Sequence, residues 1–85
     1  MKVRVIIELK DGVADPQGQT IANALGRIGV EGVRTVRVAK SLDVDIDAVD
    51  RASAEARIRE ACERLLANPV IETYHIEWPA SALEG

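Results

Sequence analysis

The stretch from Val33 to Ile46 reads VRTVRVAKSLDVDI and decides the fold. Apolar residues recur at every second position along most of it, and polar residues fill most positions between them. This alternation is typical of a β-strand that buries one face. The apolar row consists of Val36, Val38, Leu42, Val44 and Ile46. The stretch is long for a strand, so we expect it to outrun a small sheet and to serve two packing partners.

One helical pattern lies on each side of this long strand, and a shorter strand pattern lies at each end of the chain. The first strand alternates apolar and charged residues up to Leu9, and the last runs from Val70 to about Trp78. Each helix carries one apolar stripe, and each main strand has one apolar phase. The sequence therefore predicts an α+β two-layer sandwich in β-α-β-α-β order. Its antiparallel sheet has the long strand at its centre and both helices on one face.

Three local signals mark the ends of the predicted helices. Asp15 precedes Pro16, an arrangement in which the carboxylate caps the first turn and proline occupies the first helical position. Gly29 is the expected left-handed residue after the first helix. The second helix covers about residues 51–67. We expect Asn68 to take a left-handed backbone conformation there, with Pro69 preventing continuation.

Size and composition restrict the class of protein. The 85 residues form one domain, which we place at residues 1–79, followed by a loose tail at residues 80–85. The single cysteine, Cys62, excludes an internal disulfide. A net charge of −3, a pI of about 5.1 and only two aromatic residues argue against nucleic-acid binding. The chain has no signal-peptide pattern and no apolar run long enough for a membrane span. We therefore expect a cytoplasmic protein.

No catalytic or metal-binding constellation stands out. Asp43, Asp45 and Asp47 begin like an EF-hand loop, but alanine occupies its required glycine and glutamate positions. A solvated acidic face is the interpretation we favour. His75 has no nucleophile tied to it by the sequence, and Cys62 lies on the apolar face of a helix, where a buried inert thiol is expected. We predict no catalytic residue, no metal site and no bound cofactor.

Lys40 interrupts the apolar row of the long strand. Burying an unpaired ammonium group is costly. Either the strand bends so that Lys40 reaches solvent, or the side chain meets an acidic partner. A surface lysine and an interface or anion contact both fit this position.

Several motifs, taken together, resemble a known family. The motifs are Asp15-Pro16-Gln17-Gly18, Val36-Arg37-Val38-Ala39-Lys40, and Cys62 followed by Leu65-Leu66-Ala67-Asn68-Pro69-Val70-Ile71-Glu72 and Tyr74. In order and spacing they are similar to PurS, the small subunit of phosphoribosylformylglycinamidine synthase. The resemblance covers the chain up to about Trp78. One departure is Ala39, where the family commonly has a glycine that permits a kink.

The resemblance implies a role in purine biosynthesis. In that family a synthetase subunit, PurL, uses ATP and magnesium to activate the amide of formylglycinamide ribonucleotide, and a glutaminase subunit, PurQ, supplies ammonia. PurS is a homodimer without catalytic residues that brings the two together in a carbon–nitrogen ligase with glutamine as amido donor. The motif positions become candidate interface residues: Asp15, Gln17, Arg37, Lys40, Asn68 and Glu72.

Two other functions stay open at the level of sequence. The chain has the size and pattern of a stand-alone ferredoxin-like domain that senses a small molecule. The other is a small enzyme in its own right, a function for which the residues give little room. For the homodimer, we expect a second copy to cover the part of the long strand that outruns the sheet, burying Leu42, Val44 and Ile46.

Overall fold

The computed structural model describes residues 1–79. In chain order these residues form β1 (Lys2–Leu9), α1 (Pro16–Arg27), β2 (Ala39–Asp45), α2 (Arg51–Ala61), the π-helical turn η1 (Cys62–Leu66) and β3 (Glu72–Glu77). The predicted α+β class and β-α-β-α-β order are confirmed. The predicted tail at residues 80–85 lies outside the described residues.

The sheet is antiparallel, as predicted, with strand order β2-β1-β3. β1 is its central strand: Val5 pairs with Leu42 of β2 on one side and with Ile76 of β3 on the other. The strand that is central in the sequence therefore lies at an edge of the sheet. Its ladder begins only where Ala39 pairs with Glu8, because β1 ends at Leu9. The expected excess length of the 33–46 strand is thus residues 33–38, which have no ladder partner.

The core lies between one face of the sheet and α2. β1 contributes Val3, Val5 and Ile7, each at most 2% exposed, and α2 with η1 contributes Ile58 and Cys62. Burying one such aliphatic side chain contributes roughly 1.5–3 kcal/mol. The apolar phases of the other strands pack around this cluster through Leu42, Val44, Ile46, Tyr74, Ile76 and Trp78. The predicted strand faces are therefore confirmed in the paired part of the sheet.

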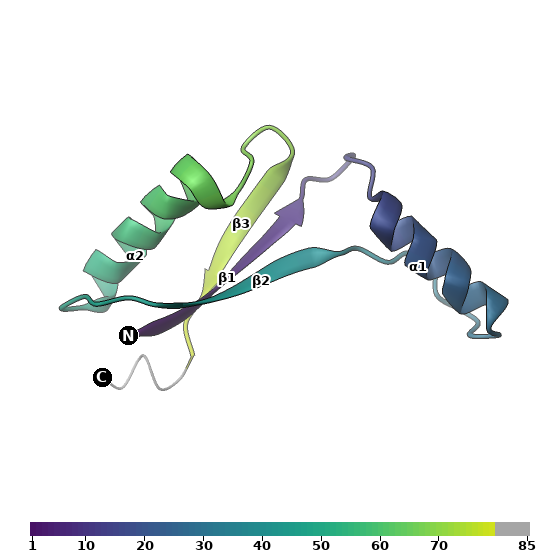
Figure 1. The fold of residues 1–85 in the computed structure, drawn as a ribbon, viewed down its shortest axis with the longest axis horizontal. Helices are drawn as coiled ribbons and strands as arrows, with labels where there is room; N and C mark the ends of the chain where they lie inside the picture. Colours follow the sequence, from purple (N-terminus) through teal and green to yellow (C-terminus); the bar gives the residue numbers. More distant parts are fainter. Residues whose placement is uncertain (80–85) are drawn as a thin grey trace.

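The placement of α1 differs from the expectation that both helices cover one face of the sheet. α1 lies beyond the end of the sheet, whereas α2 packs across it (Figure 1). None of the α1 side chains belongs to the buried core cluster, and Ile28, directly after the helix, is 74% exposed. The reason is that an apolar stripe shows only that a helix face needs cover. It does not specify which surface supplies that cover, and α2 already occupies the covered face.

Together, α1 and the residues that return to β2 form a projection, residues 16–38, which we call the arm. The return segment, residues 28–38, runs back alongside α1 (Figure 1), and Gly18 lies directly against the carbonyl oxygen of Val36. The arm contributes to the elongated outline of the molecule, which measures 50 × 29 × 15 Å. It meets the sheet only at the end where β1 stops and β2 begins.

Two of the three signals predicted for the helix ends, at Asp15 and Gly29, are confirmed. Asp15 caps α1 by accepting a hydrogen bond from the Gly18 N–H at 2.9 Å, with Pro16 as the first helical residue. Gly29 follows the helix with a φ of +87°, as predicted. Asp50 caps α2 by accepting from the Ser53 N–H at 2.7 Å.

The predicted left-handed Asn68 is wrong, because no residue other than glycine has a positive φ within residues 1–79. Helix α2 instead ends through η1. The Ala67 N–H donates to the carbonyl oxygen of Cys62 at 3.0 Å, and Ala67 itself is already extended. The Asn68 side chain then accepts from the Val70 N–H at 3.0 Å. This turn, stabilised by the amide oxygen, replaces the helix cap that we expected.

Candidate interaction surface

The described residues offer little for catalysis. No group of three or more His, Cys, Asp or Glu side chains is placed to hold a metal ion within residues 1–79. Cys62 is free and fully buried, and burial raises the pKa of its thiol, which disfavours the nucleophilic thiolate. His75 lies half-exposed beside Glu77, with its Nε2 atom 3.5 Å from the carboxylate. Within this part of the chain, no helix is long and apolar enough to span a membrane.

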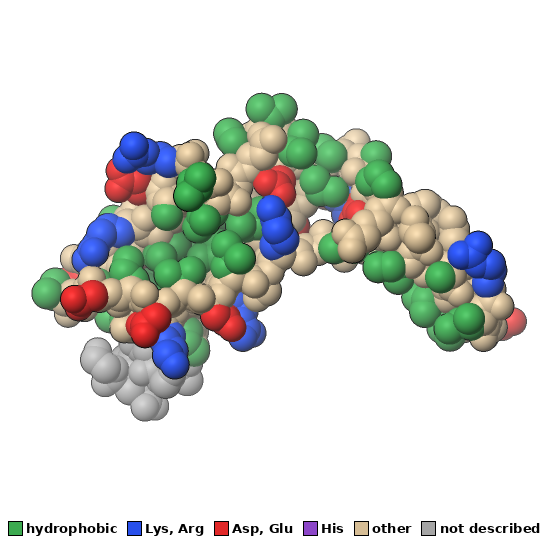
Figure 2. Space-filling view, viewed as in Figure 1, with side chains coloured by type: hydrophobic (Ala, Val, Ile, Leu, Met, Phe, Trp, Pro, Cys, Tyr) green, Lys and Arg blue, Asp and Glu red, His purple; other side chains and the backbone are tan. Residues whose placement is uncertain are grey.

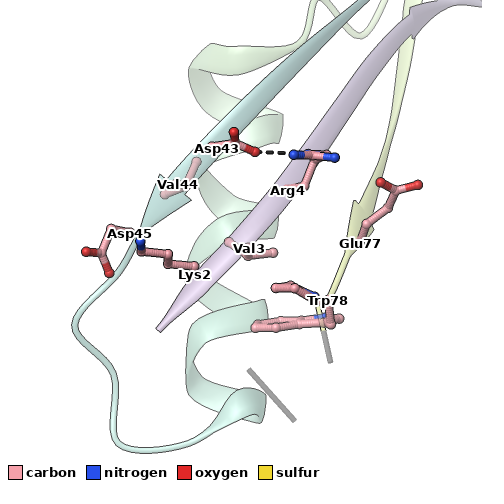
Figure 3. Close-up of a pocket in the computed structure, with 9 residues that line it drawn as sticks. Lys2, Val3, Arg4, Asp43, Val44, Asp45, Glu77 and Trp78 are labelled. Carbon is pink, nitrogen blue, oxygen red and sulfur yellow. Dashed lines mark hydrogen bonds and ion pairs between the residues drawn. The ribbon is translucent and has the colours of Figure 1, made fainter. Parts of the chain in front are cut away.

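A hollow of about 1000 Å³ lies near Trp78, at the end of the sheet where β1 begins, and all three strands line it (Figure 3). Its charged residues are largely paired with opposite charges. Arg4 Nε donates to Asp43 Oδ1 at 2.9 Å, and Asp43 is the first cause of the raised pKa of Arg4. Asp45 lies opposite Lys2 in the strand register and is 3.4 Å from the amino terminus. The acidic residues Asp43 and Asp45 are therefore engaged in surface ion pairs, and Asp47 lies beyond the strand. We assign no ligand to this hollow.

Five of the six predicted interface residues lie around one end of the sheet, where β1 stops. Asp15 and Arg37 lie where the arm joins the sheet, and Lys40, Asn68 and Glu72 form a second group beside the start of β3. The sixth, Gln17, is exposed in the first turn of α1. The structure thus brings most of the candidate interface residues to one end of the molecule.

The first group connects the two chain segments that enter and leave the arm. Asp15 Oδ1 accepts from Gly18, and Asp15 Oδ2 accepts from the Val38 N–H at 2.8 Å. The hydrogen bond from Val38, followed by that from Gly18, lowers the pKa of Asp15. Arg37 donates to the carbonyl oxygen of Val13 at 3.2 Å. The same guanidinium donates to the carbonyl oxygens of Leu9 and Lys10, at 3.1 and 3.3 Å.

The second group resolves the alternatives for Lys40. The Lys40 side chain is 61% exposed, and its Nζ atom lies 3.6 Å from Glu72 Oε2. Glu72 Oε1 in turn accepts from the Asn68 N–H at 2.7 Å. The lysine therefore both reaches solvent and meets an acidic partner. Because the lysine side of this pair is largely exposed, the pair contributes little stability.

Lys10 joins the two groups and was not predicted from the sequence. Its carbonyl oxygen accepts from Arg37, its N–H donates to the Ile71 carbonyl at 2.8 Å, and its Nζ donates to the Pro69 carbonyl at 2.6 Å. In the sequence Lys10 looks like an ordinary turn residue. Its carbonyl oxygen does accept from the nearby Val13 N–H at 3.1 Å, but Arg37, Pro69 and Ile71 all lie far along the chain. No signal in one sequence would have identified it.

Exposed apolar side chains form a second feature that the sequence did not locate. Those on the arm are Ile21, Ile28, Val30 and Val33. Figure 2 shows hydrophobic side chains gathered along one edge of the arm. A second set, Leu65, Val70 and Ile71, lies on η1 and the loop before β3. Contiguous exposed apolar surface is typical of protein–protein contact sites.

Known proteins resemble this chain over nearly its whole length. The family model PurS, described as phosphoribosylformylglycinamidine (FGAM) synthase, matches residues 2–80. The chain is 50% identical, over 74 residues, to the phosphoribosylformylglycinamidine synthase subunit PurS of Archaeoglobus fulgidus, a match covering 87% of this chain and 92% of that protein. It is 41% identical over 76 residues to the PurS subunit of Bacillus subtilis, covering 89% of each.

Solved structures agree with this assignment. The crystal structure of Methanocaldococcus jannaschii PurS, one of the subunits of formylglycinamide ribonucleotide amidotransferase, matches with a TM-score of 0.81 and 41% identity, covering 89% of this chain and 92% of that one. A chain in the structure of PurLQS from Thermotoga maritima matches with a TM-score of 0.83 and 32% identity, covering 89% and 93%. The chain therefore belongs to the PurS family of phosphoribosylformylglycinamidine synthase subunits.

Proposed function

We propose that this chain is a bridging subunit that carries no catalytic residue of its own. It would hold a PurQ-type glutaminase beside a PurL-type synthetase, so that ammonia released from glutamine converts formylglycinamide ribonucleotide to its amidine. The single observation that carries this proposal is the likeness to a chain of the T. maritima PurLQS structure. The family assignment favours this role over that of a stand-alone sensor of small molecules.

The contribution of the chain would be proximity. Docking two partners on one small protein replaces a diffusive encounter between ammonia source and ammonia consumer with a fixed arrangement. ATP and magnesium would be bound by the synthetase subunit and not by this chain. The candidate contacts on the outer surface are Gln17, Lys40, Asn68 and Glu72, and we propose the cytoplasm as the setting.

The active form would be a homodimer, with the second copy covering the arm. Two observations support this. The arm exposes Ile21, Ile28, Val30 and Val33, and β2 is an edge strand preceded by residues 33–38, which lack a ladder partner. Leu42, Val44 and Ile46 pack against the core of their own chain. The arm is therefore a better candidate for the contact than those three residues, which we had expected to be buried by dimerisation.

A reconstitution assay tests the bridging role. Synthetase and glutaminase subunits are mixed with and without this chain, and amidine formation is measured with either glutamine or an ammonium salt. We expect the chain to restore the glutamine-driven reaction and to hydrolyse neither glutamine nor ATP alone. High ammonium should bypass the requirement. If the ammonium-driven reaction needed the chain just as strongly, the bridging role would be wrong.

The same purified chain distinguishes the sensor alternative. A small-molecule sensor is stabilised by its ligand without any protein partner, because ligand binding to the folded state raises the free energy of unfolding. We expect no rise in melting temperature with purine-pathway metabolites, and a rise when the partner subunits are added.

A further inference from the structure

The arm is joined to the rest of the molecule without the usual apolar contact. A helix normally acquires its direction by burying an apolar stripe against a core. The α1 side chains are absent from the buried core cluster, and the Ile28 side chain is largely exposed. Within one copy of the chain, apolar burial therefore does not fix the direction of the arm, and the polar contacts at its base are what hold it.

Asp15 connects the entry and the exit of the arm through one carboxylate. Its two oxygen atoms accept from Gly18 at 2.9 Å, in the entering helix, and from Val38 at 2.8 Å, in the leaving segment. Hydrogen bonds to an ionised group are short and strong compared with neutral ones. By contrast, the side chain of Asp50, the cap of α2, accepts only from the local Ser53 N–H among residues 1–79. Asp15 thus does more than cap its helix.

Arg37 makes the reciprocal connection, from the leaving segment to the entering one. Its guanidinium donates to the carbonyl oxygens of Leu9, Lys10 and Val13 at 3.1–3.3 Å. Gly18 allows the two segments to approach this closely, because a Cβ atom there would overlap the Val36 carbonyl oxygen. The leaving segment is therefore held to both the end of β1 and the start of α1.

We propose that Asp15 and Arg37 form a latch that fixes the direction of the arm relative to the sheet before any partner binds. Both residues were candidates for partner contacts by family resemblance, and the latch assigns them an internal role. An arm held in one direction loses less conformational freedom on docking, which improves affinity without adding a contact. That benefit rests on the proposed function, whereas the latch itself is a property of this chain alone.

The test uses the full ¹⁵N-labelled chain without partner subunits, in an Ile28→Lys background that weakens self-association, so that a second copy does not hold the arm. Residual dipolar couplings report the orientation of α1 relative to α2 and the sheet, and amide exchange reports the Val38 hydrogen bond. In Asp15→Ser, the single hydroxyl oxygen still caps α1 but has no second oxygen for Val38. We expect Val38 exchange to accelerate about tenfold or more, with the α1 couplings reduced and those of α2 unchanged.

Arg37→Gln provides a second variant that leaves the helix cap intact, and it should also reduce the α1 couplings. Matched controls are Asp50→Ser, which alters a cap without a long-range bond, and Arg34→Gln, on the same segment but outside the latch. Both controls should leave the couplings of α1 unchanged. Unaltered α1 couplings and Val38 exchange in both latch variants would overturn the proposal. Because no amidation is measured, failure of the bridging role would not affect this result.

Discussion

The carboxylate of Asp15 accepts a hydrogen bond from the backbone N–H of Val38 at 2.8 Å, across 23 positions of the chain. A residue that looks like an ordinary helix cap in the sequence therefore also closes the base of a projecting arm. The bond from Val38 is the largest cause of the lowered pKa of Asp15, ahead of the local bond from Gly18.

Because the pKa of Asp15 is lowered on folding, the free energy of unfolding should fall as the solution becomes acidic. A carboxyl whose folded pKa lies below its unfolded value, about 3.9 for aspartate, stabilises the protein fully above the unfolded pKa. The contribution is lost as pH falls through the folded pKa. Asp50, whose pKa is lowered first by the Ser53 N–H, acts in the same direction. We measure the free energy of unfolding by urea denaturation from about pH 6 down to about pH 2. We expect it to decline less steeply for Asp15→Ser than for the wild type. An identical decline would contradict us.

Two glycines of α1 should respond oppositely to alanine. A Cβ at Gly18 would overlap the Val36 carbonyl oxygen, whereas one at Gly26 would meet nothing within 4 Å. We expect Gly18→Ala to lower the free energy of unfolding by about 1–3 kcal/mol through overpacking. Gly26→Ala should raise it by up to about 1 kcal/mol through helix propensity. Chemical denaturation measures both, and equal effects would show that the close approach has no cost.

Replacing a large side chain of α2 or η1 by alanine should lower the free energy of unfolding only on the face that packs against the core. Ile58 is 3% exposed in the core, and Leu65 is 82% exposed. We expect Ile58→Ala to destabilise by about 2–5 kcal/mol and Leu65→Ala by less than about 0.5 kcal/mol. Differential scanning calorimetry measures the two melting temperatures. A large loss for Leu65→Ala at low protein concentration would mean that Leu65 is covered within the subunit.

Self-association should depend on the apolar surface of the arm. We expect Ile28→Lys to raise the dimer dissociation constant at least about tenfold, which corresponds to about 1.4 kcal/mol. Val49→Lys is the control, because Val49 is 92% exposed and lies outside the arm. Sedimentation equilibrium at micromolar concentrations measures both. A wild-type chain that is a stable monomer under these conditions would refute the homodimer.

The two-residue alternation of the strands and the local capping signals of the helices predicted the part of the fold in which the strands are paired. The alternation in β1 and in residues 39–46 identified the buried faces correctly, because the core covers one face of the sheet. The cap at Asp15 and the left-handed Gly29 also follow from short-range chemistry. Such features depend on neighbouring residues, so one sequence is sufficient to predict them.

Features that depend on residues far apart in the sequence could not be predicted in the same way. The apolar stripe of α1 indicated a buried helix but not an arm beyond the sheet. Asn68 matched a left-handed cap in composition, yet a π-helical turn after Cys62 ends the helix first. The links from Lys10 to Arg37, Pro69 and Ile71 join positions far apart in sequence. Only the folded chain brings these groups within hydrogen-bond distance.

The length of α1 gives the arm mechanical leverage. Its 12 residues span about 18 Å at 1.5 Å per residue. A rotation of about 10° at Asp15 would therefore displace the far end of the helix by about 3 Å, roughly the length of one hydrogen bond. A substitution at the base of the arm can thus produce a small rotation there and a larger displacement at the tip. It can change which atoms of the tip contact a docked partner, even though no residue of the tip itself has been substituted.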